Sequence, residues 1–237
     1  MSMANSHNHT VQLLDRIPFH IDREQLARTL RLREGSPYLA QCLQLAEQAE
    51  ALARPKALYR VAYVGEKGAN WVELDGRRLK SRILRVNLDE AERVFFFITT
   101  CGVELETWAN GIEDLLQKFW ADAIKELALE AASRYLHEHL LKRYHLGGIS
   151  AMHPGSLDDW PLSAQEDVFA FLDNPQELVG VRLTESFLMY PVKSVSGVYF
   201  PTMTSFESCQ LCPREHCRSR KAPFDAELFA RRYQETE

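Results

Sequence analysis

The sequence lacks an excess of positive charge and lacks any long hydrophobic run. Lysine and arginine number 28 against 33 aspartates and glutamates, which gives a net charge of −5. Proteins that bind nucleic acid through phosphate contacts usually carry a basic face, so this balance argues against a nucleic-acid partner. No stretch reaches the roughly 18 consecutive apolar residues of a membrane span, and residues 1–15 hold no apolar secretory core. We therefore expect a cytoplasmic protein with neither a nucleic-acid nor a membrane partner.

The signatures of several common enzyme classes are also missing. The sequence contains neither the G-x-G-x-x-G fingerprint of dinucleotide-binding proteins nor the phosphate-binding loop G-x-x-x-x-G-K-[ST]. The G-x-S-x-G elbow and the H-E-x-x-H zinc motif are absent as well. His137 and His139 stand two residues apart on a predicted helix, so they point to different faces and do not form a paired metal site. We expect both to be solvated or partly buried histidines.

The hydrophobic patterns predict both helices and strands around a substantial core. Hydrophobic residues make up 46% of the 237 residues and charged residues 26%, which is typical of a soluble globular protein. Val94–Thr100 is β-branched and aromatic throughout and predicts a strand buried on both faces. Further strands are predicted over residues 57–64, 71–74, 179–184 and 195–200. Helices are predicted over residues 22–32, 37–52, 112–145 and 163–172 and from residue 225, with Asp22 as an N-cap and Ser163 with Glu166 as a capping box. Because helices and strands do not alternate regularly, the pattern favours an α+β fold.

Three of the five cysteines crowd together near the C-terminus. Cys209, Cys212 and Cys217 have the spacing C-x2-C-x4-C. An odd number of cysteines does not resemble a disulfide framework, and clustered thiols in a reducing compartment more often bind metal or carry redox chemistry. The spacing brings three thiolates within reach of one metal ion, with Cys101 or His216 as a candidate fourth ligand. An iron–sulfur cluster, zinc and metal-free thiols are the three alternatives.

Residues 183–200 combine hydroxyl groups, a proline turn and a glycine. A predicted strand brings Thr184, Glu185 and Ser186 to one place, and a turn at Pro191 follows. Small hydroxyl residues and glycine allow a ligand to approach the backbone closely, and Tyr199 adds a flat surface with a polar tip. This composition suits a polar organic ligand. A strand–turn–strand hairpin with polar edges is the alternative.

The same stretch resembles the activation domain, the S-adenosylmethionine-binding domain, of cobalamin-dependent methionine synthase. That family carries a run of the form L-T-E-S-x-x-M-x-P-x-x-S-V-S-G-x-Y-F, which Leu183–Phe200 matches nearly throughout. Leu136-His137-Glu138 and Pro154-Gly155 match further family features, and the Pro-Gly-x-x-x-x-Trp-Pro-Leu-x-x-Gln form of residues 154–165 is closer to stand-alone relatives from anaerobic bacteria. The resemblance is strong over roughly residues 120–200 and diffuse over 20–120.

This resemblance implies an antiparallel β-sheet flanked by helices, in keeping with the α+β pattern. On this basis we divide the chain into a disordered tail over residues 1–15 and an N-terminal helical and strand lobe over 16–110. An activation-domain-like core follows over 111–205. Residues 206–237 form a C-terminal segment with the cysteine cluster and a helix.

The resemblance also implies a role beside cobalamin. The family's module binds S-adenosylmethionine and caps a corrinoid-carrying module while Co(II) is reduced and methylated. A chain of 237 residues without the corrinoid signature D-x-H-x-x-G implies a stand-alone activation protein whose partner, a corrinoid-binding methyltransferase, holds the cobalamin. An iron–sulfur cluster would suit the low-potential electron that this step needs. The alternatives are a non-catalytic module that docks on a corrinoid protein, with zinc or thiols as a structural staple, and a diverged relative that binds another small molecule.

The resemblance places a set of residues around the ligand. The family's loop Arg-Pro-Ala-Pro-Gly-Tyr corresponds here to residues 151–156, so Ala151 and Ser156 replace the arginine and the tyrosine. The missing arginine would pair with the ligand's carboxylate, and Lys193 or His153 is the candidate to replace it. The predicted ligand-binding residues are His153, Pro154, Gly155, Glu185, Ser186, Lys193, Ser194, Ser196, Gly197 and Tyr199, and the predicted metal ligands are Cys209, Cys212 and Cys217.

Overall fold

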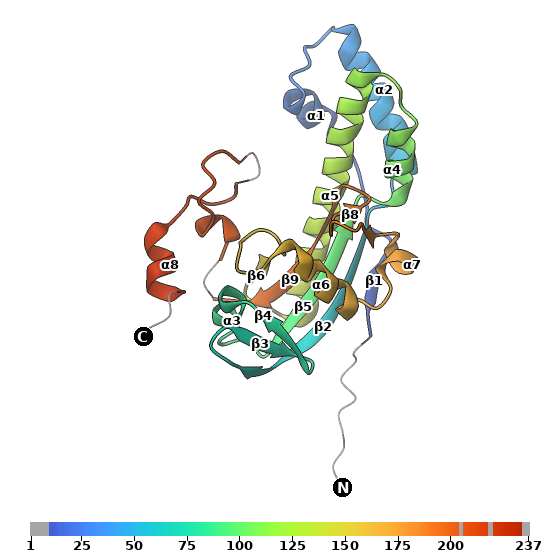
Figure 1. The fold of residues 1–237 in the computed structure, drawn as a ribbon. Coiled ribbons are helices and arrows are strands. Elements are labelled where there is room, and N and C mark those ends of the chain that lie inside the picture. The colour runs from blue at the N-terminus through green and yellow to red at the C-terminus, as the bar shows by residue number, and fades with distance from the viewer. Residues whose placement is uncertain (1–9, 204–205, 218–219, 234–237) are drawn as a thin grey trace.

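The computed structural model describes residues 10–203, 206–217 and 220–233 (Figure 1). The helices are α1 (Arg23–Thr29), α2 (Pro37–Leu52), α3 (Arg82–Asn87), α4 (Val103–Asn110), α5 (Leu115–Tyr144), α6 (Gln165–Phe171), α7 (Pro175–Val179) and α8 (Ala226–Arg232). The strands are β1 (Gln12–Leu14), β2 (Lys56–Lys67), β3 (Trp71–Leu74), β4 (Arg77–Lys80), β5 (Arg93–Thr100), β6 (Ile149–Met152), β7 (Arg182–Leu183), β8 (Met189–Tyr190) and β9 (Ser194–Pro201). Within the described residues, no helix has the length and apolar character needed to cross a membrane.

One antiparallel sheet forms the centre of the molecule. Its strands follow the order β4-β3-β2-β5-β9-β6, and β1 pairs with the first part of β2. β7 and β8 form a separate two-stranded hairpin. The α+β prediction, with an antiparallel sheet flanked by helices, is therefore confirmed.

The central strand β5 is buried on both faces, as its sequence predicts. Val94, Phe96 and Ile98 belong to a core cluster with side chains of α3, α6 and α7. Phe95 and Phe97 point the other way and join a cluster with Ala132, Leu136 and Leu140 of α5. Successive side chains of a strand alternate between its two faces, so this division follows directly from the unbroken apolar run.

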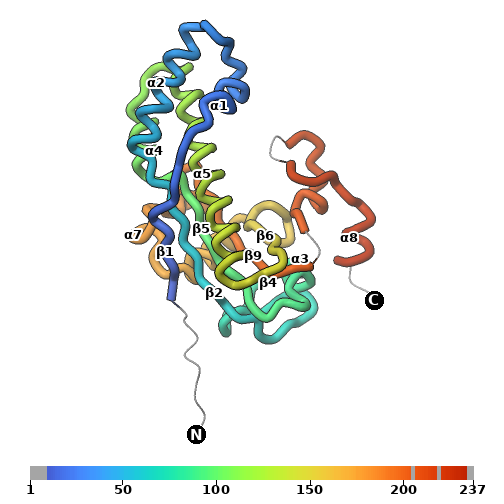
Figure 2. The backbone as a smooth tube through the Cα atoms, turned by 180° about the vertical axis from the view of Figure 1, so that it is seen from behind, coloured from blue at the N-terminus to red at the C-terminus, as the bar shows by residue number. Residues whose placement is uncertain are grey.

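A helical arm extends beyond the sheet and consists of α1, α2, α4 and the first half of α5 (Figures 1 and 2). The arm has its own core, in which Cys42, Leu105 and Trp120 are almost completely buried. α5 is continuous over 30 residues and is therefore about 45 Å long, which lets it pack in the arm and also behind the sheet. Where arm and sheet meet, Lys125 and Glu106 form a buried ion pair with an N–O distance of 3.1 Å.

Four details differ from the sequence-based predictions. Residues 12–14, placed in the predicted disordered tail, form β1, while residues 1–9 lie outside the described residues. The predicted loop after α5 contains β6, a four-residue strand recognisable only through its partner β9. The predicted strand over 179–184 is confirmed only for β7, because Val179 ends α7 and the left-handed Gly180 follows it. The Ser163–Glu166 capping box is also wrong, because Ser163 lies in a 3-10 turn and α6 begins without a side-chain cap.

Truncating a leucine where α5 packs on the sheet should destabilise the protein strongly. Leu136 is 0% exposed, so Leu136→Ala removes buried apolar atoms and leaves a cavity, which costs about 2–5 kcal/mol. Leu115 lies on the same helix at 81% exposure, and Leu115→Ala should change the free energy of unfolding by no more than about 0.5 kcal/mol. Urea unfolding followed by circular dichroism measures both changes. Equal losses for the two variants would contradict this packing.

Candidate functional site

The edge formed by β6 and β9 brings three of the predicted ligand-binding residues together. Ala151 pairs with Tyr199 and Met152 with Val198, so the loop that follows β6 begins beside Gly197. A Cβ atom on Gly197 would lie 2.2 Å from the carbonyl oxygen of Met152 and 2.9 Å from His153 Nδ1. Only glycine allows this approach, and it places the predicted residues His153, Gly197 and Tyr199 side by side.

Tyr199 lies in an aromatic cluster at this edge. Its ring stacks on Phe97 with the centroids 4.3 Å apart, and His137 from α5 meets it edge-on at 5.9 Å. His153 meets Phe97 edge-on at 5.8 Å. Burial, together with the nearby Glu207 carboxylate, raises the pKa of Tyr199 to about 12, so its phenol stays neutral. His137 was expected to be a solvated or partly buried histidine within the family-like step Leu136-His137-Glu138; the structure leaves it partly buried and brings it to Tyr199.

His153 is held in one orientation. Its Nδ1 donates a hydrogen bond to the carbonyl oxygen of Ser196 at 2.9 Å, which leaves Nε2 as an acceptor in the neutral ring. Burial lowers the pKa of His153 and Lys221 adds to this, although the Ser196 carbonyl opposes both. The imidazole is therefore neutral near pH 7. It offers a hydrogen-bond acceptor at this edge rather than the positive charge of an arginine.

The loop after β6 closes on itself. The amide of Gly155 donates to the carbonyl of Trp160 at 2.8 Å, and the amide of Ser156 donates to the carbonyl of His153 at 3.2 Å. Gly155 has φ +80, and a Cβ there would lie 3.0 Å from the Leu162 side chain. Pro154 precedes this turn and is buried. The Pro-Gly to Trp-Pro-Leu spacing is thus the spacing of a compact turn that only glycine fits.

Ser194 and Ser196 are predicted ligand-binding residues whose hydroxyls lie inside the protein. Ser194 Oγ is 2.8 Å from the Pro191 carbonyl oxygen and 2.9 Å from Thr100 Oγ1. Ser196 Oγ donates to the side-chain oxygen of Gln165 in α6. The two serines are 8% and 2% exposed, so both hydroxyls connect β9 to its neighbours. A contact of either serine with a ligand stays a prediction.

Lys193 is engaged by carboxylates of α5. Its Nζ lies 2.9 Å from Glu126 and 3.1 Å from Asp122. These ion pairs join the start of β9 to the helical arm. They also occupy the ammonium group that sequence reasoning offered as a replacement for the family's arginine.

Glu185 and Ser186 lie in the exposed turn between β7 and β8. Thr184 closes this turn, since its amide donates to the Leu188 carbonyl at 2.8 Å and its Oγ1 lies 3.1 Å from Ser186 Oγ. The hairpin is followed by Lys193 and the start of β9, whereas Tyr199 stands five residues further along that strand, about 17 Å away. The predicted set is therefore divided between the β6–β9 edge and the junction with the arm.

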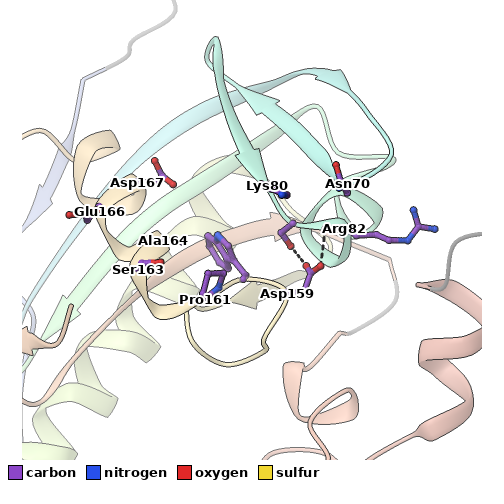
Figure 3. A pocket seen from close by; sticks show the side chains of 11 residues that line it. Asn70, Lys80, Arg82, Asp159, Pro161, Ser163, Ala164, Glu166 and Asp167 are labelled. Carbon is purple, nitrogen blue, oxygen red and sulfur yellow. Dashed lines mark hydrogen bonds between the residues drawn. The ribbon is translucent and has the colours of Figure 1, made fainter. Parts of the chain in front are cut away.

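The face of the sheet that α3 and α6 cover is hollowed beside these two helices. A pocket of about 510 Å³ opens between the start of α3 and the start of α6 (Figure 3). At its floor Asp159 accepts hydrogen bonds from the Ser81 hydroxyl and from the amides of Arg82 and Ile83, so this carboxylate caps α3. None of the predicted ligand-binding residues lines this pocket. A smaller one of about 230 Å³ lies at the start of β6, beside Gly148 and Thr202.

The predicted metal ligands are partly exposed. Cys209 and Cys212 are partly buried and Cys217 is exposed. Within residues 10–203, 206–217 and 220–233, no three His, Cys, Asp or Glu side chains are grouped so that they could hold a metal ion. Cys101, one candidate fourth ligand, is 0% exposed in the core of the helical arm. The other candidate, His216, is exposed next to Cys217.

The protein should lose stability as the pH falls through the unfolded-state pKa of histidine. Because folding lowers the pKa of His153, the unfolded chain binds more protons below pH about 6.5, so this contribution is complete above that pH and is lost below it. Thermal unfolding between pH 7.5 and 5.5 measures the slope. His153→Asn keeps a side-chain donor and cannot titrate, so its slope should be smaller. An unchanged slope would contradict the lowered pKa.

Comparison with known proteins shows what part of the chain and its fold are similar to. Residues 155–211 match the family model described as "Vitamin B12 dependent methionine synthase, activation domain". No curated protein matches the chain. Among solved structures, the crystal structure of the MetH reactivation domain bound to AdoHcy is similar, with a TM-score of 0.58 and 19% identity over 84% of this chain and 81% of that chain. The resemblance to the activation domain is confirmed: the chain has that domain's fold, and residues 155–211 carry the family's sequence signature.

Proposed function

We propose that this protein binds S-adenosylmethionine at the β6–β9 edge and supports the reductive reactivation of a partner corrinoid methyltransferase. The pairing of Ala151 with Tyr199 carries this proposal. It sets the loop that corresponds to the family's Arg-Pro-Ala-Pro-Gly-Tyr directly beside Tyr199, the tyrosine of the run Val-Ser-Gly-Val-Tyr-Phe. The similar MetH reactivation domain was crystallised with AdoHcy, which is S-adenosylmethionine without its methyl group.

The residues of this edge would act by positioning a bound methyl donor. Tyr199 and Phe97 form a stacked aromatic pair that is only 9% and 1% exposed, so the pair supports the β6–β9 edge from inside the protein. His153 presents Nε2 as an acceptor, and its Nδ1 bond to Ser196 fixes the ring. S-adenosylmethionine, when bound, supplies the methyl group, and holding a methyl donor in line with its acceptor is what such a site contributes to the rate.

The ligand's carboxylate has no arginine at the family's position, because Ala151 stands there. Lys193 pairs with Asp122 and Glu126, and His153 is neutral. These observations favour weak binding, and they keep the second candidate function open, which is a non-catalytic module that docks on a corrinoid protein. Isothermal titration with S-adenosylmethionine and AdoHcy separates the two. Heat that saturates supports the ligand site, whereas no heat at millimolar ligand removes it and leaves docking alone.

The role in reactivation is tested with the corrinoid. The purified chain is mixed with a cobalamin-loaded corrinoid domain in the Co(II) state, a chemical reductant and S-adenosylmethionine. Ultraviolet–visible spectra should show methylcobalamin forming faster than in a mixture without the chain. Equal rates in the two mixtures would contradict an activating role.

Restoring the arginine should strengthen binding. Ala151→Arg adds a guanidinium beside Tyr199 that can bond a ligand carboxylate, and a charge-assisted hydrogen bond of at least about 1.4 kcal/mol corresponds to about tenfold tighter binding of S-adenosylmethionine. Ala151→Gln is the matched control, because it adds similar bulk without charge and should change the affinity much less. Equal affinities of both variants and the wild type would place the ligand's carboxylate elsewhere.

A further inference from the structure

The three clustered cysteines lie in a stretch that has almost no core of its own. Phe206 is buried before the cysteines, Leu211 between Cys209 and Cys212, and Tyr233 after them, all three in the cluster that covers one face of the sheet, against which the partly buried Leu228 of α8 also packs. Between them, no described side chain of residues 212–217 and 220–232 is buried. Figure 1 shows this segment and α8 beside the sheet and away from the helical arm. Apart from Leu228, apolar burial therefore stabilises the two ends of the segment and contributes little to its middle.

The anchors themselves are specific. The Tyr233 hydroxyl donates to Asn87 Oδ1 at 2.7 Å, and Arg82 Nε donates to the Tyr233 carbonyl at 2.6 Å. The amide of Phe206 donates to Ser150 Oγ at 2.8 Å. The start of the segment is thus hydrogen-bonded to β6 and its end to α3. The residues between form a loop whose two ends are both fixed to the sheet layer.

One residue gathers the backbone of all three cysteines. The guanidinium of Arg220 donates from Nη1 to the Cys209 carbonyl at 3.0 Å and from Nη2 to the Cys212 carbonyl at 3.2 Å. Its backbone amide donates to the Cys217 carbonyl at 3.3 Å. The C-x2-C turn is closed as well, because the Cys212 amide donates to the Cys209 carbonyl at 3.3 Å. The Cys209 and Cys212 carbonyls therefore meet at the Arg220 guanidinium, and the Cys217 carbonyl meets the Arg220 backbone amide.

A thiol is already a hydrogen-bond acceptor at this point. The amide of Lys221 donates to Cys209 Sγ at 3.4 Å. The thiolate is the form of cysteine that ligates metal.

We propose that Cys209, Cys212 and Cys217 bind one thiophilic metal centre, zinc or an iron–sulfur cluster, and that Arg220 is its positioning residue. A segment with so little buried apolar surface is stabilised by a cross-link, and three thiolates on one metal provide one. The side chains are not gathered in the described structure, but each of the three backbones is hydrogen-bonded to Arg220. Closing the site therefore requires the three side chains to move toward one another while Arg220 keeps these backbone contacts. The proposal does not depend on S-adenosylmethionine binding.

Metal analysis and thiol titration test this on the full chain. The protein is purified anaerobically, stripped with a chelator and loaded either with Zn²⁺ or with iron and sulfide. Cys42 and Cys101 are 0% exposed, so a thiol reagent applied to the native protein should count three thiols in the stripped form. Loading should protect all three and leave one zinc per chain, or iron and sulfide in about equal amounts with visible absorption. The loading condition, zinc or iron with sulfide, that gives a stoichiometric product identifies the metal centre.

Matched arginine variants test the positioning role. Arg220→Lys keeps the charge but cannot bond two carbonyls through a planar group, and it should weaken metal binding about 10- to 100-fold, as loss of a supporting hydrogen bond does at other metal sites. Arg214→Lys, at an exposed arginine of the same segment, should leave the affinity unchanged. Circular dichroism confirms that both variants keep the fold. Equal affinities for the two variants would contradict the role of Arg220.

Three results would overturn the metal site. The first is a protein that holds less than stoichiometric metal both after loading with Zn²⁺ and after loading with iron and sulfide. The second is unchanged metal content in the C209S/C212S/C217S variant, which would place the metal elsewhere. The third is a disulfide between any two of these cysteines in the anaerobically purified protein, detected by mass spectrometry.

Discussion

β5 has a strand on either side and a layer of side chains on each face, and the rest of the molecule is arranged around it. β2 and β9 pair with it along nearly its whole length. α5 covers the face of Phe95 and Phe97, and α3, α6 and α7 cover the face of Val94, Phe96 and Ile98. Because α5 packs there, His137 reaches Tyr199. Because β9 packs there, Gly197 meets the loop after β6. Burial of one apolar strand thus positions the candidate ligand-binding edge.

Local signals were sufficient for the elements that carry their own pattern. The apolar run of residues 94–100 predicted a doubly buried strand, and the 3- and 4-residue spacing after Ile112 predicted the long helix. Asp22 predicted the start of α1, and it accepts a hydrogen bond from the Gln25 amide. β4, β6 and α4 were missed, because each is short and owes its stability to partners distant in the sequence.

The candidate site was only partly predictable for a similar reason. A linear motif shows which residue types occur together, but it does not show that Tyr199 and Ser194 lie at opposite ends of one strand. Nor does it show that Lys193 meets two carboxylates more than sixty residues earlier in the chain, or that Gln165 receives the Ser196 hydroxyl. The pairing of Ala151 with Tyr199 and the convergence of three cysteine carbonyls on Arg220 likewise exist only in three dimensions.

The unbroken course of α5 has a mechanical consequence. Trp120 sits in the core of the arm and His137 at the aromatic cluster, 17 residues later on the same helix and therefore about 26 Å away along its axis. A helix without a break behaves as a stiff rod over this distance, and both of its halves are embedded in packed side chains. A displacement of the tip of the arm would therefore be carried along α5 to the part of the helix that contacts Tyr199.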